Sequence, residues 1–164
     1  MTMANKCKSL LMVLCLACLT GCDRSDDLES IFTGKVWHLA GFYQTTDWDN
    51  PNMSLPMNSD YNSHSDLSAY NITFFTDGTA HVTLPQGVQL TALWTADGNE
   101  RRRTFSFSEW KTIQGDLTTL IGSAKQMYDR LHKTAYYQGN AQYIQLFDDS
   151  KRYFIQFADL SKYK

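Results

Sequence analysis

Short runs of aromatic and β-branched residues, separated by turn residues, are the feature of this sequence that most restricts its fold. The clearest example is the pair of runs 70–76 and 79–84, which flank Asp77-Gly78. An Asp-Gly pair between two such runs is the strongest short-range signal for a β-hairpin. Apolar and polar residues alternate in 104–107 and 153–157, as they do in strands with one buried face. The chain is therefore predicted to be mainly β.

About eight strands are predicted from this pattern. They are expected at 35–43, 70–76, 79–84, 88–94, 101–107, 135–137, 142–147 and 152–158. Three further hairpin turns are predicted, at 97–99, at Gly139-Asn140 and at 148–150. With 164 residues, the chain suits one domain with a substantial hydrophobic core.

One segment has the periodicity of a helix instead. Its apolar residues fall on a single helical stripe, made of Leu117, Leu120, Ile121, Ala124, Tyr128 and Leu131. Asp116 is placed to cap the N-terminus of this helix, and Lys133 lies near its C-terminal end. One amphipathic helix among strands is expected to cover a sheet face or the mouth of a barrel.

The N-terminal segment has the character of a targeting sequence. It contains all the cysteines of the chain, namely Cys7, Cys15, Cys18 and Cys22. Lys6 and Lys8 lie before the apolar run 10–19, an arrangement typical of a secretory signal peptide. A helix over that run would span about 15 Å, about half of a bilayer's hydrocarbon core, so a lasting transmembrane helix is not expected.

The residues Leu19-Thr20-Gly21-Cys22 resemble the lipobox of bacterial lipoproteins. The resemblance implies that residues 1–21 are a signal peptide that is removed. It also implies that Cys22 carries the lipid that attaches the protein to a membrane. An ordinary secretory cleavage site beside a chance cysteine is the alternative. A lipidated Cys22 would be the one cysteine of the mature chain, which excludes a disulfide.

Residues 22–30 are polar and acidic and lack an apolar period, so we predict an acidic tether between the lipid and the domain. The Ser-Asp-Asp-Leu-Glu run at 25–29 also resembles the acidic surface-export signal of Bacteroidetes lipoproteins. This resemblance implies an outer-membrane lipoprotein on the cell surface rather than on the periplasmic face. A plain solvated linker, with the lipid in the periplasmic leaflet, is the alternative.

The remaining residues, 31–164, carry a series of short motifs. These are Gly-Lys-Val-Trp-His-Leu at 34–39, a Phe-x-x-Asp-Gly hairpin at 74–78, a late helix leading into 136–146, and a last strand through 154–157. In this order they resemble the META domain of heat-shock-type lipoproteins and, more loosely, the lipocalin-like lipoproteins of Bacteroidetes. The resemblance implies a small closed or nearly closed antiparallel β-barrel with one covering α-helix, in families that are mostly uncharacterised.

No functional residue is carried over from either family, because the sequence departs from both patterns. The Gly-Cys-Asn motif that follows the early META hairpin has no counterpart in 79–85. The Gly-x-Trp of the first lipocalin strand is replaced by Gly34-x-x-Trp37.

The candidate contact residues lie in a long polar tract at 45–69. Loops of this length inside a compact domain are usually functional or disordered. Asp47, Trp48 and Asp49 are the candidates for contact with a ligand or partner. Trp48 could stack on a sugar or a partner, or fold back over the barrel mouth, and both remain open. Calcium binding is not expected, because Pro51 stands at the fifth position of the would-be loop, where an EF-hand needs an oxygen ligand.

No motif for catalysis is found, so the chain is predicted not to be an enzyme and to need no cofactor. Nucleophile motifs, phosphate loops and dinucleotide fingerprints are missing, and none of the four histidines pairs at metal-ligand spacing. A net charge of −2 offers no basic field for nucleic acid. The expected partners are the membrane, through the lipid, and an unknown protein, glycan or small molecule.

Two functions follow from these predictions. The first is a non-catalytic binding or interaction module, whose barrel would be filled by side chains. The alternative is a lipocalin-type carrier of a small hydrophobic ligand, which would need an internal cavity of several hundred Å³, as ordinary ligand sites have. A hydrolase that uses the 45–69 tract would require acid and base groups with perturbed pKa values.

Overall fold

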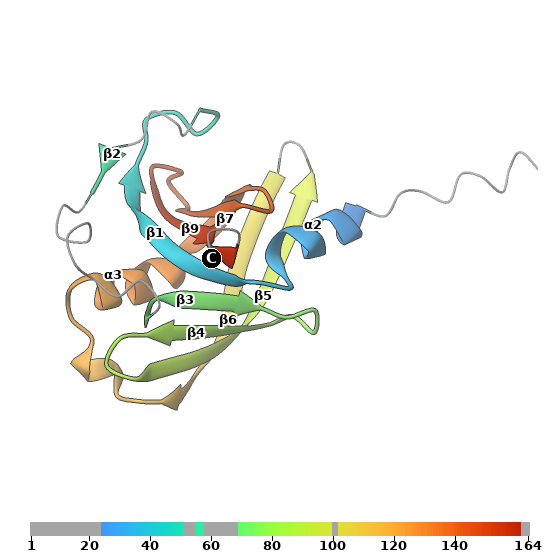
Figure 1. The fold of residues 1–164 in the computed structure, drawn as a ribbon. Coiled ribbons are helices and arrows are strands. Elements are labelled where there is room, and N and C mark those ends of the chain that lie inside the picture. The colour runs from blue at the N-terminus through green and yellow to red at the C-terminus, as the bar shows by residue number, and fades with distance from the viewer. Residues whose placement is uncertain (1–23, 51–54, 58–68, 100–101, 162–164) are drawn as a thin grey trace, which may run out of the picture.

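The computed structural model describes residues 24–50, 55–57, 69–99 and 102–161, and its elements are shown in Figure 1. Residues 1–21, predicted to be a signal peptide, and Cys22 lie outside the described residues. The strands are β1 (Val36–Gln44), β2 (Leu55–Pro56), β3 (Asn71–Phe74), β4 (Thr79–Leu84), β5 (Val88–Asn99), β6 (Arg102–Gln114), β7 (Thr134–Gly139), β8 (Tyr143–Asp148) and β9 (Tyr153–Asp159). The helices are α2 (Arg24–Phe32), the 3-10 helix η5 (Leu117–Thr119) and α3 (Gly122–Leu131).

The strands form an antiparallel meander that closes on itself. From β3 to β9 each strand pairs with the next, and β1 pairs with both β3 and β9, which completes a ring of eight strands. The short β2 adds to β1 outside the ring. The predicted mainly β, nearly closed barrel of about eight strands is therefore confirmed.

The weakest seam of the ring lies between β6 and β7. Among the described residues these strands share a single pair, Thr104↔Tyr136, whereas β5 and β6 pair along nearly their whole length. The long connection that contains η5 and α3 enters at this seam. Because β6 and β7 pair so little, the strands form a nearly closed barrel and not a fully closed one.

Three of the four predicted hairpin turns are confirmed. At the β3–β4 turn the Asp77 carboxylate accepts a hydrogen bond of 2.9 Å from the Thr79 amide, and Gly78 adopts a φ of +81° that a side chain would disfavour. Asn140 shapes the β7–β8 turn in the same way, and residues 148–150 turn β8 into β9.

The fourth turn, predicted at 97–99, is wrong in position. Asp97 and Gly98 are still paired, with Thr104 and Arg103 of β6, so the strands continue to Asn99 and resume at Arg102. Gly98 is needed for close packing instead of for a turn. A Cβ atom at this position would lie 2.7 Å from the Tyr137 hydroxyl and 2.8 Å from Leu28.

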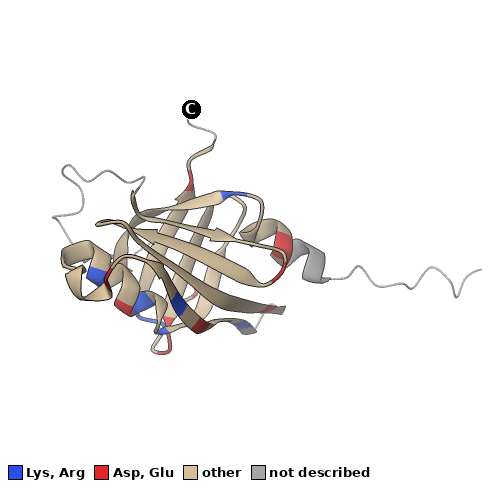
Figure 2. Ribbon diagram, turned by 90° about the horizontal axis from the view of Figure 1, so that it is seen from below, with Lys and Arg blue, Asp and Glu red and all other residues tan. Residues whose placement is uncertain are grey.

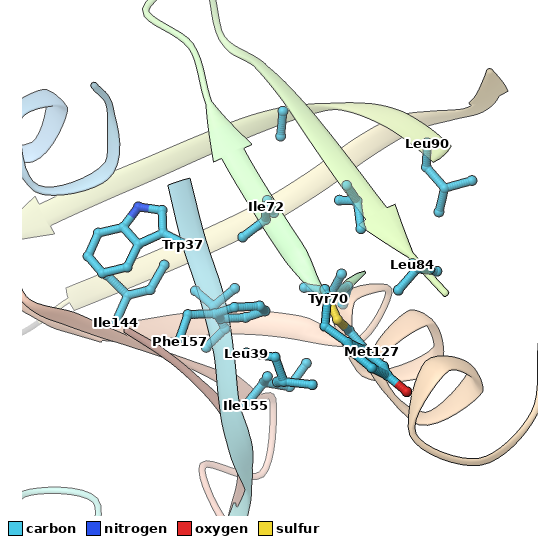
Figure 3. Packing of buried hydrophobic residues seen from close by; sticks show 14 of the residues in the cluster. Trp37, Leu39, Tyr70, Ile72, Leu84, Leu90, Met127, Ile144, Ile155 and Phe157 are labelled. Atoms are coloured by element: carbon cyan, nitrogen blue, oxygen red, sulfur yellow. The ribbon is translucent and has the colours of Figure 1, made fainter. Parts of the chain in front are cut away.

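Large apolar side chains fill the inside of the ring. Inward positions alternate along the strands, as in β1, where Trp37 and Leu39 are buried between less buried neighbours. Figure 3 shows Trp37 next to Ile144 of β8, and Leu39 close to Phe157, its cross-strand partner on β9, so side chains of adjoining strands pack against one another inside the ring. The interior is a packed core.

The segment predicted as a tether at 22–30 is corrected, because α2 begins at Arg24 and continues to Phe32. Phe32 is fully buried, and its ring centroid lies 5.2–5.3 Å from those of Phe74, Trp94, Phe105 and Tyr137. Three apolar residues hold the helix, namely Leu28, Ile31 and Phe32, but of these Leu28 alone lies within 22–30, so that stretch by itself shows no apolar period. The folded unit therefore begins before residue 31.

The single helix predicted after Asp116 is two helices. Asp116 caps η5 as predicted, since its carboxylate accepts a 2.9 Å bond from the Thr118 amide. Leu120 and Ile121 are extended and interrupt the helix before α3. Ile121 is 71% exposed, contrary to the predicted buried stripe, and Met127 is buried instead.

The two α-helices close opposite ends of the barrel, as Figures 1 and 2 both show. At one end α2 inserts Phe32. At the other end α3 inserts Ala124, Met127 and Leu131, and Met127 lies beside Tyr70 in Figure 3. A helix over one mouth was predicted, and the second helix was not.

Candidate functional site

A cleft of about 630 Å³ lies between α3 and the neighbouring ends of β8 and β9. It is larger than two further hollows on the barrel, of about 320 and 380 Å³. Its apolar lining includes Leu146 and Ile155, both buried core residues, together with Tyr153 and Phe154. Ligand sites in proteins typically have this volume and this mixture of an apolar wall and a few polar groups.

The periodicity of α3 explains why one helix both plugs the barrel and lines the cleft. Ala124, Met127 and Leu131 follow a spacing of three and four and face the core. Gly122, Lys125, Gln126 and Asp129 follow the same spacing on the next face and line the cleft. Figure 2 shows residues of both charge signs on α3, at the end of the barrel opposite α2.

Arg130 is the most unusual side chain of the cleft. It is half-buried, and its guanidinium carbon lies 5.4 Å from the ring centroid of Tyr153 and 6.0 Å from that of Phe42. Its Nη2 donates to the Met57 sulfur at 3.1 Å. Burial lowers the pKa of Arg130, while the charges of Asp148 and Tyr153 act in the opposite direction. A guanidinium remains charged at neutral pH all the same.

The other charged groups of the cleft already have partners or turn functions. Lys125 binds both carboxylate oxygens of Asp129, at 2.9 and 2.8 Å, in an exposed i,i+4 ion pair. Asp148 accepts hydrogen bonds from the Ser150 hydroxyl at 2.7 Å and from the Tyr153 amide at 3.5 Å, which stabilises the β8–β9 turn. Lys133 completes the lining just beyond α3.

The candidate residue Trp48 is folded back onto the outer wall of the barrel, away from the mouth. Its ring centroid lies 4.6 Å from that of Phe147 and 5.7 Å from that of Tyr136. Lys151 covers the same ring at 4.7 Å, and Gln138 donates a 2.7 Å bond to the Trp48 carbonyl oxygen. The ring is folded back, but over β7 and β8 and not over the barrel mouth as one alternative expected, and its stacking on a sugar or a partner stays a prediction.

The two aspartates beside Trp48 are placed differently from one another. The Asp47 carboxylate accepts from the amides of Asp49 and Asn50, at 2.9 and 3.3 Å, and so forms an Asx turn. Asp49 is exposed. None of the three predicted contact residues lines the cleft beside α3. Their role as contacts for a partner stays a prediction.

Trp48 belongs to a second aromatic cluster, on the outside of the barrel wall. In it, Phe147 and Phe154 are fully buried although they face away from the core, with ring centroids 4.6 Å apart. Tyr43 stacks on Phe154 at 5.2 Å. The start of the predicted polar tract at 45–69 therefore covers a small outer core. The strand β2 (Leu55–Pro56) lies within the same tract. Residues 51–54 and 58–68 of the tract lie outside the described residues.

Sequence reasoning missed the cleft, because it considered only the apolar side of the α3 segment. The sequence does indicate a charged face on this helix, because Lys125 and Asp129 are four residues apart, the spacing at which helical side chains form an ion pair. Over the described ranges, no three His, Cys, Asp or Glu side chains come together in a way that could hold a metal ion. Within the same ranges, no helix is both long and apolar enough to cross a membrane.

Comparison with known proteins places this fold in a family. Residues 23–159 match the family described as domain of unknown function DUF4847. The chain belongs to the DUF4847 family. The match begins beside α2 and ends with β9, so the family domain includes the helix as well as the barrel.

A solved DUF4847 protein has the same fold as this chain. The crystal structure of a DUF4847 family protein from Bacteroides vulgatus is 25% identical, with a TM-score of 0.64, covering 80% of this chain and 96% of that one. An NMR structure of a protein from Burkholderia xenovorans matches with 14% identity and a TM-score of 0.48, over 82% of this chain and 88% of that one. No match was found among curated proteins.

Proposed function

We propose that this DUF4847 chain is a lipid-anchored lipoprotein of the bacterial cell envelope, and that its barrel is a non-catalytic binding module. The ligand is held in the cleft beside α3 rather than inside the barrel. The proposal keeps the resemblance to META-like and lipocalin-like lipoproteins at the level of architecture, since lipocalins are also eight-stranded up-and-down barrels.

The observation that carries this proposal is the contrast between a filled interior and an open cleft. Trp37, Phe74, Phe105 and Phe157 are among the fully buried side chains of the core. A carrier that encloses its ligand needs several hundred Å³ of free space at that place. A cleft with a volume of this size, about 630 Å³, lies at the α3 end instead. The same contrast weighs against the lipocalin-type carrier.

The chemistry of the cleft favours binding over catalysis. Active sites usually hold carboxylates or histidines whose pKa values are shifted by the site. The carboxylates with lowered pKa values here, Asp77 and Asp116, are exposed turn and cap residues held by Thr79 and Thr118. The Asp129 carboxylate in the cleft is held by Lys125.

The proposed anchor rests on the lipobox-like residues before Cys22 and on the place of α2. The helix begins at Arg24, two residues after Cys22, and ends in the core with Phe32. A lipid on Cys22 would therefore hold the α2 end of the barrel near the membrane. The helix α3, which lines the cleft, lies at the opposite end of the barrel (Figure 1), so the cleft would lie away from that membrane. We propose the outer membrane as the location, with display on the cell surface.

Native mass spectrometry of protein purified from bacterial envelopes tests the binding site. We expect a co-purifying small molecule on the wild-type protein and its loss in Gln126→Trp, which places an indole in the cleft. Lys111→Trp, at an exposed position of β6, is the matched control and should retain the molecule. A ligand that persists in Gln126→Trp would show that it binds elsewhere. Wild-type protein with no bound molecule would count against a small-molecule ligand.

A further inference from the structure

The guanidinium of Arg130 leaves most of its hydrogen-bonding capacity unused. Arginine has five N–H donors, and the hydrogen bond recorded for this group, within the described part of the chain, goes to the Met57 sulfur. A thioether is a weak acceptor. Within the described residues, the ion pair found is Lys125–Asp129, which does not include Arg130. A half-buried guanidinium with unused N–H donors is stabilised when an anion binds to it.

Neither of the two carboxylates that line the cleft forms an ion pair with Arg130. Asp129 has both oxygens on Lys125. Asp148 raises the pKa of Arg130 by its charge, but it lies beyond ion-pair distance and uses its Oδ1 for the β8–β9 turn. With Lys133 at the rim, three cations face two carboxylates across the cleft, so its charge balance favours an anion.

The wall beside Arg130 is apolar and extends into the barrel core. Ile155 and Leu146 are 1% and 2% exposed, so each shows only an edge to the cleft, while Tyr153 is 37% exposed and offers a ring face. Tyr153 already positions the guanidinium through its ring. A ligand whose acidic group meets Arg130 would therefore lie with its other atoms against this apolar wall.

We propose that the cleft binds an amphipathic anion. Its acidic head group, a carboxylate or a phosphate, pairs with the planar fork of Arg130, and its apolar part covers Tyr153 and Ile155. Arginine suits either head group, because both accept two parallel N–H bonds. This inference rests on the proposed binding function of the cleft and adds the chemical class of the ligand.

Calorimetric titration with three eight-carbon probes tests the head group. The probes are octanoate, octyl phosphate and octan-1-ol, and the protein is the full chain with Cys22→Ala, so that no attached lipid competes. We expect at least one anion to bind about tenfold or more tightly than the alcohol, as a charged hydrogen bond in a partly desolvated site does. Comparing the two anions identifies the preferred head group.

Variants separate the head-group inference from the binding proposal. Arg130→Met keeps an apolar stem and should bring the anion and the alcohol to within about twofold of each other. Arg130→Lys keeps the positive charge without the planar guanidinium, and it replaces Arg130→Met in the titration if that variant does not fold. Lys111→Met, at an exposed β6 position, is the control and should retain the preference.

The outcomes that overturn the inference differ from those that overturn the proposed function. Equal binding of all three probes, abolished by Gln126→Trp, would keep the cleft as a site and overturn the anion preference. An anion preference that survives Arg130→Met would overturn the role of Arg130. If none of the probes binds, or if Gln126→Trp has no effect on them, both proposals fail.

Discussion

The indole Nε1 of Trp37 donates a hydrogen bond of 2.8 Å to the backbone carbonyl oxygen of Phe32. Both side chains are fully buried, so the bond joins the last residue of α2 to the second residue of β1 inside the fold. A buried carbonyl without such a donor would be costly. The helix that follows Cys22 is therefore an integral part of the barrel.

Replacing Phe32 with alanine should strongly destabilise the protein. Removing a fully buried phenylalanine ring costs about 3–5 kcal/mol of unfolding free energy, because a cavity remains among its four aromatic neighbours. Urea denaturation would measure the loss. Ile121→Ala, at a position that is 71% exposed, is the control and should change stability by less than about 0.5 kcal/mol. Equal effects of the two substitutions on the free energy of unfolding would contradict the role of Phe32 in closing this end of the barrel.

Replacing Trp48 with alanine should destabilise the outer aromatic cluster. The half-buried indole contacts Phe147 and Tyr136 and is covered by Lys151. Loss of these contacts should lower the unfolding free energy by about 2 kcal/mol. Asp49→Ala, at an exposed neighbouring position, should change it by less than about 0.5 kcal/mol. Unchanged stability of the Trp48 variant would argue that the ring serves a partner instead.

The Asp116 cap predicts a dependence of stability on pH. Hydrogen bonds from the Thr118 amide and hydroxyl lower the pKa of Asp116 below its ordinary value of 3.8. Its contribution to stability is therefore present above about pH 3.8 and is lost as the pH falls through the lower, folded-state pKa. Asp116→Asn should lose less stability than wild type between pH 4 and pH 2 in thermal unfolding. Parallel curves would reject this assignment.

Replacing Cys22 with alanine should release the protein from membranes. Without the thiol no lipid can be attached at this position. Cell fractionation and immunoblotting would measure this. Cys18→Ala, within the predicted signal peptide, leaves the modified thiol in place and should stay membrane-bound. Continued pelleting of the Cys22 variant would count against lipidation.

Surface display can be measured by protease treatment of intact cells. We expect the wild-type protein to be degraded while a periplasmic marker stays intact. If the acidic run at 25–29 is the export signal, replacing Asp26 and Asp27 with asparagine should protect the protein from the protease. Full protection of the wild type would place it on the periplasmic face.

Most strands were predictable because a strand is recognised from neighbouring residues. The two-residue period of 104–107 and the Asp77-Gly78 turn are local features, and both are present in the structure. The turn at 97–99 failed for a non-local reason. Gly98 serves the close approach of Leu28 and Tyr137, which are distant in sequence, and it resembles a turn glycine only in its immediate context.

Apart from the Lys125–Asp129 spacing, the site was not predictable, because its central contact is not local. Its central contact joins Arg130 of α3 to Met57 and to Tyr153 of β9, residues separated by many positions in the chain. They lie together because β1 and β9 close the ring and α3 inserts Met127 into its mouth. By itself the sequence determined the strand pattern, most turns and the predicted address of the protein. Closure, the docking of α2 and the charged cleft were decided by tertiary structure, because each depends on which distant surfaces bury one another.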